Sequence, residues 1–309
     1  MRSLSSLRAA LLLGASLLST ACASGGGRVV TAGPGSPAAL RVYHVKSKQF
    51  VSFTQFANDI ASNDLVFFGE NHDDPATHAA EHAVLAALGE RRPHVVLSLE
   101  MFERDVQPLL DQYLAGTISE ANFLAGSRPW DRYNTDYRPM VELARVRGWP
   151  VVASNVPRRL ASAVGRASLT LLDTLNAGDR RYMAREHSCP KDAYYTKFVA
   201  AMGGHGAGGA SGSSSMADRF YEAQCAKDEA MAEALVASWR AAPSGSVALH
   251  VDGAFHSDYG LGTAERARRR APGVKSVVLT AVPVKDLARP EIAAHADKAD
   301  YLLFTRAPL

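Results

Sequence analysis

The sequence predicts an α/β protein with a mainly parallel sheet, helices on both faces and a helical cap region. Short, continuously apolar runs alternate with longer segments of helical periodicity along most of the chain. Such runs are typical of strands buried on both faces, and their alternation with helices is typical of a parallel sheet. With 309 residues, 47% of them hydrophobic, the chain is long enough to bury a sizeable core.

The first 22 residues resemble a bacterial lipoprotein signal peptide. Two arginines precede a short apolar stretch, and small residues follow it directly before Cys22. We therefore expect residues 1–22 to be a signal peptide and Cys22 to be lipidated, which anchors the protein to a membrane. Ser19 replaces the usual leucine, so ordinary signal-peptide cleavage is the alternative. Ala23 after the cysteine favours the outer membrane, with the protein facing the periplasm.

Two further stretches are rich in small residues. Residues 23–39 are Gly, Ser, Ala and Pro rich, and we expect them to form a flexible tether to a single domain over residues 40–309. Residues 203–215 predict a mobile loop or lid within that domain. Cys189 and Cys225 either pair in an oxidising periplasm or remain two free thiols. The formal net charge of +3 gives no reason to expect nucleic acid as a partner.

The expected strands are the apolar runs, which are short and bounded by turn residues. They cover residues 40–45, 49–53, 65–68, 94–99, 150–154, 247–251 and 275–281. The first two are alternating and suggest a hairpin, whereas the others read as core strands. No solenoid repeat, dinucleotide-binding glycine fingerprint or Walker-type loop is present.

The expected helices follow the strands. The clearest one follows the strand that ends at Phe68: Asp74 is placed as its N-cap, Pro75 stands at its first position, and it ends near Gly89. The others are a short helix through Ile60, then residues 103–114, 119–125, 139–147, pieces of 160–185, 216–239 and 263–270.

Polar side chains follow four of the predicted strands at their carboxyl ends. They are Glu70 and His72, Glu100, Asn155, and His256. In an open parallel sheet, ligands bind just beyond the carboxyl ends of the strands. We therefore expect these residues to form one rim of a functional site.

Two of these strand ends share a Gly-x-x-His pattern. Gly69 and His72 form one pair, and Gly253 and His256 form the other. Glycine permits a sharp turn that directs the imidazole back over the sheet edge. Gln224 and Asp228 are four residues apart on a predicted helix, so they share one face, and we assign them to the same rim. Gly69, Gly253 and Asn155 are also predicted rim residues.

The chemistry of this rim has three readings. Glu70, His72 and His256 suit a divalent metal, since imidazole and carboxylate are common metal ligands. Alternatively Glu70, His72, Glu100 and His256 are catalytic residues of an acid–base site. The third reading is a hydrogen-bonded network that only holds the loops. His78 and His82 share a helix face and have metal-binding spacing, but surface histidines on such helices are commoner.

Residues 128–138 form an unusual aromatic and basic segment. Flat rings interleaved with guanidinium groups suit a planar anionic ligand such as haem. A tyrosine phenolate also ligates ferric iron in some haem proteins, and Tyr133 and Tyr137 are the expected ligands. A hydrophobic capping loop with solvated arginines is the alternative. The predicted haem-binding residues are Arg128, Trp130, Arg132, Tyr133, Tyr137 and Arg138.

An ordered set of sequence blocks resembles the ChaN-like haem-binding lipoproteins of the Tiki superfamily. The blocks are FFGENHDDPATHAAEH, SLEMFERDVQPLLDQYLAG, RPW followed by DYRPMVELA, PVVASNVPRRLA, FYEAQCAKDEAMAE and HVDGAFHSDYGLG. The resemblance implies an α/β fold, haem binding linked to iron uptake, and a homodimer that holds haems face to face. It also implies that the paired Gly-x-x-His motifs and Glu100 are the superfamily's polar site. In other branches that site supports metal-dependent peptidase or esterase-like hydrolysis, which is the alternative function.

Overall fold

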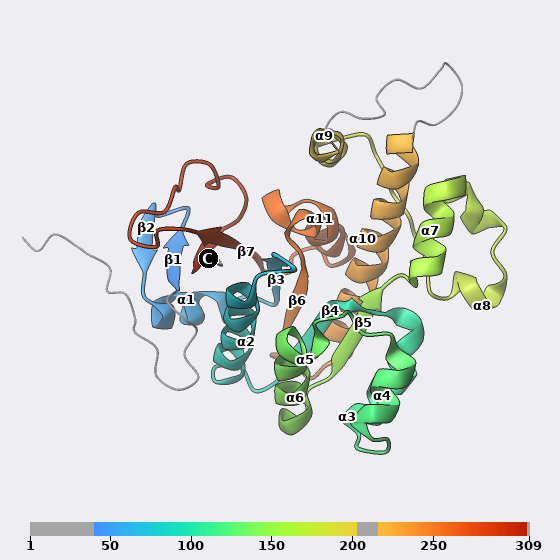
Figure 1. Ribbon diagram of the computed structural model, residues 1–309, viewed down its shortest axis with the longest axis horizontal. Coiled ribbons are helices and arrows are strands. Elements are labelled where there is room, and N and C mark those ends of the chain that lie inside the picture. The colour runs from blue at the N-terminus through green and yellow to red at the C-terminus, as the bar shows by residue number, and fades with distance from the viewer. Residues whose placement is uncertain (1–39, 203–215, 308–309) are drawn as a thin grey trace, which may run out of the picture.

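The computed structural model describes residues 40–202 and 216–307, and an eight-stranded sheet runs through it (Figure 1). The strand order is β2-β1-β8-β7-β3-β6-β4-β5. The six strands from β8 to β5 pair in parallel, whereas β1 pairs antiparallel with both β2 and β8. This confirms the predicted, mainly parallel α/β fold. The predicted signal peptide and its Cys22, the tether, and the loop 203–215 lie outside the described residues.

The strands are β1 (Arg41–His44), β2 (Gln49–Val51), β3 (Leu65–Glu70), β4 (Val95–Glu103), β5 (Val151–Asn155), β6 (Val247–Gly253), β7 (Ser276–Val284) and β8 (Tyr301–Arg306). The α-helices are α1 (Phe53–Ile60), α2 (Pro75–Gly89), α3 (Gln107–Leu114), α4 (Glu120–Ser127), α5 (Tyr133–Asp136), α6 (Arg138–Arg147), α7 (Arg158–Ala167), α8 (Ala177–Arg180), α9 (Ala193–Ala201), α10 (Met216–Ala241) and α11 (Gly262–Arg270). Short 3-10 turns cover Arg104–Val106, Leu169–Asp173, Ala254–His256 and Asp258–Gly260.

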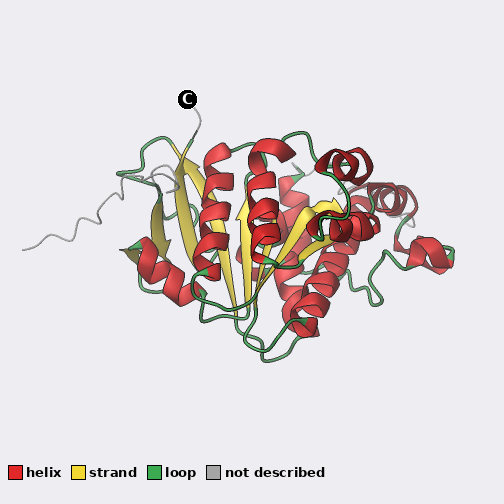
Figure 2. Cartoon of the chain, turned by 90° about the horizontal axis from the view of Figure 1, so that it is seen from below, coloured by secondary structure: helices red, strands yellow, loops and turns green. Residues whose placement is uncertain are grey.

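Helices cover both faces of the sheet (Figure 2). Every residue of β3 is buried, which is why residues 65–68 are continuously apolar, and the strand ends in the buried Glu70. Its side chains alternate between the two faces: Val66 and Phe68 belong to one apolar cluster, Leu65 and Phe67 to the other. The first cluster includes residues of α1, α2 and α6, and the second includes residues of α10 and α11.

The start of α2 is built as its sequence predicts. The Asp74 carboxylate accepts hydrogen bonds from the backbone N–H groups of Ala76 and Thr77, and Pro75 occupies the first turn. The chain between β3 and α2 is therefore a short, fixed turn. That turn holds Asn71, His72 and Asp73 at the carboxyl edge of the sheet.

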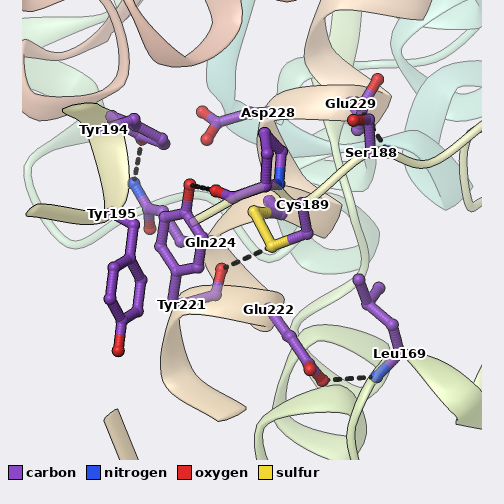
Figure 3. Close-up of a disulfide and its surroundings, with 12 residues drawn as sticks. Leu169, Ser188, Cys189, Tyr194, Tyr195, Tyr221, Glu222, Gln224, Asp228 and Glu229 are labelled. Carbon is purple, nitrogen blue, oxygen red and sulfur yellow. Dashed lines mark hydrogen bonds between the residues drawn. A yellow bond between two sulfur atoms is a disulfide. The ribbon is translucent and has the colours of Figure 1, made fainter. Parts of the chain in front are cut away.

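The helical cap lies beyond the edge strand β5, where α7 and the short helices after it pack against α10 (Figure 1). A disulfide between Cys189 and Cys225 ties the segment before α9 to α10 (Figure 3). It settles the two cysteines in favour of pairing. No helix of residues 40–202 or 216–307 is long and apolar enough to cross a membrane.

Four elements differ from the sequence prediction. The first is α9, since no helix was expected between residues 185 and 216. β8 was not expected, although its apolar run from Tyr301 to Phe304 is buried between β1 and β7. β4 continues to Glu103, where a helix was expected, because Met101 and Phe102 remain in the core. The segment 128–138 contains a helical turn, α5, instead of a continuous connection.

Candidate functional site

The carboxyl ends of β3, β6 and β4 lie next to one another, and they bring three of the predicted rim residues together. A Cβ atom on Gly253 would lie 2.7 Å from Nε2 of His72 and 3.6 Å from Oε2 of Glu100. A Cβ atom on Gly69 would lie only 2.9 Å from the Cα of Ala254. Both glycines are therefore required for close approach across the rim. The sequence prediction gave them a sharp turn instead, but neither residue has a positive φ.

His256 is held between two buried carboxylates. Its Nδ1 lies 2.6 Å from Asp228 on α10, and its Nε2 lies 3.3 Å from Glu100 on β4. The other oxygen of Glu100 accepts a hydrogen bond of 2.8 Å from the Gly253 N–H. Burial lowers the pKa of His256, but the charges of Glu100 and Asp228 outweigh it and raise the pKa to about 10. The imidazolium is thus fully paired, which leaves no free ring nitrogen for proton abstraction.

Two further predicted rim residues, Gln224 and Asn155, lie in different environments. The Gln224 amide nitrogen lies 3.1 Å from Nδ1 of His256 and donates to the Tyr194 hydroxyl, also at 3.1 Å. Gln224 and Asp228 therefore reach His256 from one face of α10. Asn155 instead accepts a hydrogen bond from the neighbouring Val156 N–H, so its side chain fixes the turn after β5.

Glu70 and His72 form the second half of the rim. One oxygen of Glu70 accepts a hydrogen bond from His72 Nδ1 and another, of 2.8 Å, from the Tyr137 hydroxyl. The bond to Glu70 raises the pKa of His72 against the opposing effect of burial. Glu70 is buried, whereas 46% of the His72 side chain is exposed. The His72 ring is thus exposed at the surface, where it can carry a charge or bind a ligand, and the buried Glu70 carboxylate holds it in place.

The aromatic segment 128–138 lies against this half of the rim. The Trp130 ring is 5.0 Å from the His72 ring and nearly perpendicular to it. Tyr137 packs against Trp130 and reaches Glu70. In the sequence, the segment and the Gly-x-x-His rim are far apart and predict two separate sites. The structure joins them, with His72 as the shared residue.

His72 separates two pockets. The first has a volume of about 900 Å³ and is lined by Trp130, Tyr137 and four arginines, among other residues. The second has a volume of about 720 Å³ and is lined by Glu70, Gln224, Gly253 and His256, with Phe198 and Met202 from the cap side. Both volumes fall in the usual range for small-molecule sites. The four arginines of the first pocket are Arg128, Arg132, Arg158 and Arg159.

Most of these arginines already have acidic partners. Arg128 pairs with Glu103 and Asp105, and Arg132 pairs with Asp136. Arg138 pairs with Glu120 and does not line the pocket, contrary to expectation.

Arg158 differs from its neighbours, because it has no ion pair or hydrogen bond from its side chain among residues 40–202 and 216–307. It is exposed at the first turn of α7. In the sequence it follows the β5 strand end by three residues, with no sign that it lines a pocket together with Trp130.

The two predicted tyrosine ligands are both buried phenols. Tyr133 packs against Phe102 and Phe123, and it is absent from the lining of the pocket. Its burial raises the pKa of the phenol. Tyr137 lines the pocket, but burial and the Glu70 carboxylate raise its pKa strongly. Neither environment favours the phenolate form that binds ferric iron.

The ligand atoms that could hold a metal ion form a different set from the predicted one. Within the described residues, Glu70 comes together with His78 and Glu81, and the ligand atoms of these three buried side chains lie within 4.8 Å of one another. His72 and His256 are not in this set. His82, which was paired with His78 in the sequence analysis, is not in it either.

Comparison with solved structures shows the same fold in ChaN of Campylobacter jejuni, described as binding haem cofacially. The TM-score is 0.65 at 15% identity, and the match covers 87% of this chain and 97% of that chain. Weaker likenesses are to RRSP, a MARTX toxin effector domain from Vibrio vulnificus CMCP6, and to the type III effector HopBA1. Their TM-scores are 0.42 and 0.38, at 15% and 11% identity. They cover 76% and 82% of this chain and 37% and 92% of those chains.

Among curated proteins, none matches. A family model described as haem-binding uptake, Tiki superfamily, ChaN matches residues 56–267. This range contains every residue of the rim and of the aromatic segment. Because the match spans most of the chain, the protein belongs to the ChaN family of haem-binding uptake proteins in the Tiki superfamily.

Proposed function

We propose that this protein binds haem in the pocket between Trp130, Arg158 and His72, and that it acts as a carrier or store in haem and iron uptake. The observation that carries the proposal is the convergence of an aromatic ring, an unpaired guanidinium and a supported imidazole on one pocket of about 900 Å³. Haem is planar and apolar and carries two carboxylates. Trp130 suits its ring, and Arg158 suits a carboxylate.

Two pocket residues carry an atom able to ligate the iron. The Tyr137 hydroxyl donates to Glu70, so it would have to give up both that bond and its proton. His72 directs Nδ1 to the same carboxylate, which leaves Nε2 as the ligating atom of the neutral ring. The support of a histidine by a carboxylate is a common arrangement for a metal ligand. His72 is therefore the first ligand to test, with Tyr137 second.

Titration of the purified protein with haemin tests the proposal. We expect a saturable Soret band, about tenfold or more weaker binding in Arg158→Ala, and an altered band position in the ligand variant, His72→Ala or Tyr137→Phe. Arg166→Ala is the matched control, because this exposed arginine lies on the same helix outside the pocket. The absence of saturable binding in the parent protein would overturn the proposal.

We also propose a lipid anchor at Cys22, outer-membrane attachment facing the periplasm, and a homodimer as the haem-loaded form. The lipoprotein-like first segment supports the anchor, and the cofacial haem binding described for ChaN of Campylobacter jejuni supports the dimer. In the full chain, Cys22→Ser should abolish both acyl labelling and recovery of the protein in the membrane fraction. Light scattering with and without haemin should show a doubling of mass. Unchanged fractionation, or a monomer in both states, would contradict these assignments.

Metal-dependent hydrolysis of a peptide or ester is the second candidate function. The convergence of His72, Gly253 and Glu100 beside a pocket of about 720 Å³ favours it. The pairing of both His256 ring nitrogens with carboxylates counts against it, because an imidazolium with both N–H groups paired cannot act as a general base. A peptide and ester panel with added divalent metals tests it. Inactivity throughout, or activity that survives His256→Ala, would count against hydrolysis.

A further inference from the structure

A fully buried acidic cluster surrounds His78 directly beneath the rim. Glu70 and Asp136 approach the ring from the β3 and α5 sides, and Glu81 lies one turn further along α2. At most 3% of any of these four residues is exposed. Buried carboxylates are costly unless a cation or a full set of hydrogen bonds compensates them. Within the described residues, no lysine or arginine forms an ion pair with Glu70 or Glu81.

The hydrogen bonds of His78 fix which ring nitrogen carries a proton. Nε2 lies 3.0 Å from the backbone carbonyl oxygen of His72 and 3.3 Å from Oδ2 of Asp136. A carbonyl oxygen only accepts hydrogen bonds, so Nε2 must be the protonated nitrogen. In the neutral ring, Nδ1 then directs a lone pair at Glu81 Oε2, 3.1 Å away, and at Glu70 Oε2, 3.8 Å away. Lone pairs facing one another require a proton or a metal cation between them.

Two carboxylate oxygens of the cluster have no partner. Glu70 Oε2 and Glu81 Oε1 are buried and make no hydrogen bond within the described residues. These unpartnered oxygens belong to the same three side chains whose ligand atoms lie within 4.8 Å of one another. Since neither oxygen meets a donor, they point to an occupant, which is either a metal cation or a proton that Glu70 and Glu81 share.

The spacing of the donor atoms is compatible with a bound metal ion. A tetrahedral site with bonds of about 2.1 Å separates its ligand atoms by about 3.4 Å. The separations of 3.1 and 3.8 Å from His78 Nδ1 to the two carboxylates bracket that value. The far nitrogen of the same ring donates to the His72 carbonyl oxygen and lies 3.3 Å from Asp136 Oδ2; a hydrogen bond of this kind from the second nitrogen commonly orients a metal-binding histidine.

We propose that Glu70, His78 and Glu81 bind a divalent transition-metal ion such as Zn²⁺, with the His72 carbonyl oxygen orienting His78 and Asp136 beside it. The site is separate from the haem pocket and has a structural role, since its buried position leaves no room for a substrate. The ion would neutralise Glu70 Oε2 while Oε1 holds His72 and Tyr137. It would therefore fix the carboxylate that supports the pocket above it.

Metal binding to the full chain, stripped with chelator and free of haem, tests the site. We expect one Zn²⁺ per chain after gel filtration and a rise in melting temperature with added Zn²⁺. Glu81→Gln keeps the shape of a protonated carboxyl but removes the anionic ligand, so it should fold and bind Zn²⁺ at least 100-fold more weakly. His82→Gln is the matched control on the same helix, and it should bind like the parent.

Three results would overturn the proposal. The first is a parent protein that neither retains Zn²⁺ nor gains stability from it, which would leave a shared proton as the occupant. The second is a Glu81→Gln variant that binds Zn²⁺ as tightly as the parent. The third is a loss of Zn²⁺ in His72→Ala with retention in Glu81→Gln, which would place the ion on the rim. Because haem is absent from the assay, these outcomes are independent of the haemin titration.

Discussion

Gly253 controls how closely the His72 ring approaches the strand ends. The backbone at this residue has φ of −55°, a conformation that alanine adopts without strain, so a Cβ atom is excluded only by its neighbours. The nearest of these are Nε2 and Cε1 of His72, at 2.7 and 2.9 Å from the Cβ position. Gly253, the glycine of the second Gly-x-x-His pair, thus leaves the space that His72, the histidine of the first pair, occupies.

Gly253→Ala should therefore displace His72 while leaving the fold intact. The half-exposed ring can swing outward, so we expect a destabilisation near the low end of the range of about 1–3 kcal/mol for overpacking. The displaced ring loses its bond to Glu70, and the raised pKa of His72 should fall towards its ordinary value. NMR titration of the His72 ring measures this shift.

The pH dependence of stability gives a second readout of the same change. A histidine with a raised native pKa contributes stability below about pH 6.5, and the contribution is lost as the pH rises through the native value. Gly253→Ala should abolish the part of the pH dependence of stability that comes from His72. Gly165→Ala is the control, since its Cβ would meet only ordinary contacts at 3.6 Å or more. An unchanged His72 pKa in Gly253→Ala would refute the steric account.

Single residues show where sequence reasoning succeeds and where it stops. Glu70, His72 and His256 could be assigned to a sheet edge because each directly follows an apolar strand. The contact of Tyr137 with Glu70 could not be predicted, since it joins residues 67 positions apart and depends on how α5 and α6 pack over β3. The same holds for Arg158, whose freedom from acidic partners is a property of the folded surface.

At the scale of elements, α10 links the cap to the site. Its residues Gln224 and Asp228 contact His256, and Cys225 between them is bonded to Cys189 (Figure 3). The two cysteines are 36 positions apart, and their Cα atoms lie at 5.6 Å. Sequence could not decide between a disulfide and free thiols, because that distance is set by how the segment before α9 crosses α10.

Removal of this disulfide should destabilise the cap and loosen the site. Closing a loop of 36 residues is worth between about 3 and 4 kcal/mol through the entropy of the unfolded chain. We expect a loss of this size in urea unfolding of the double variant Cys189→Ala, Cys225→Ala. A reducing agent should produce a similar loss in the parent and none in the variant. Equal stability of the two proteins under oxidising conditions would show that the bond contributes nothing.

The whole sheet depends on its last strand. β8 lies between β7 and the hairpin of β1 and β2, so it alone connects that hairpin to the parallel strands. The class of fold was predictable, because buried strands alternating with helices have few other solutions. The position of β8 was not predictable. The last strand predicted from the sequence covers residues 275–281, and the order of strands in a sheet leaves no local signal in the sequence.

A chain that ends at Pro290 should consequently fail to fold. It loses Leu302, Leu303 and Phe304, which are fully buried and contribute about 1.5–3 kcal/mol each, or roughly 5–9 kcal/mol together. That sum is comparable with the total stability of about 5–15 kcal/mol of a typical protein. The control is a chain that ends at Ala307, which keeps all of β8 and should melt like the parent. Circular dichroism and thermal unfolding distinguish the two. A cooperative, unshifted transition in the shorter chain would show that the hairpin and β8 fold apart from the site-bearing strands, and that the haem pocket does not need them.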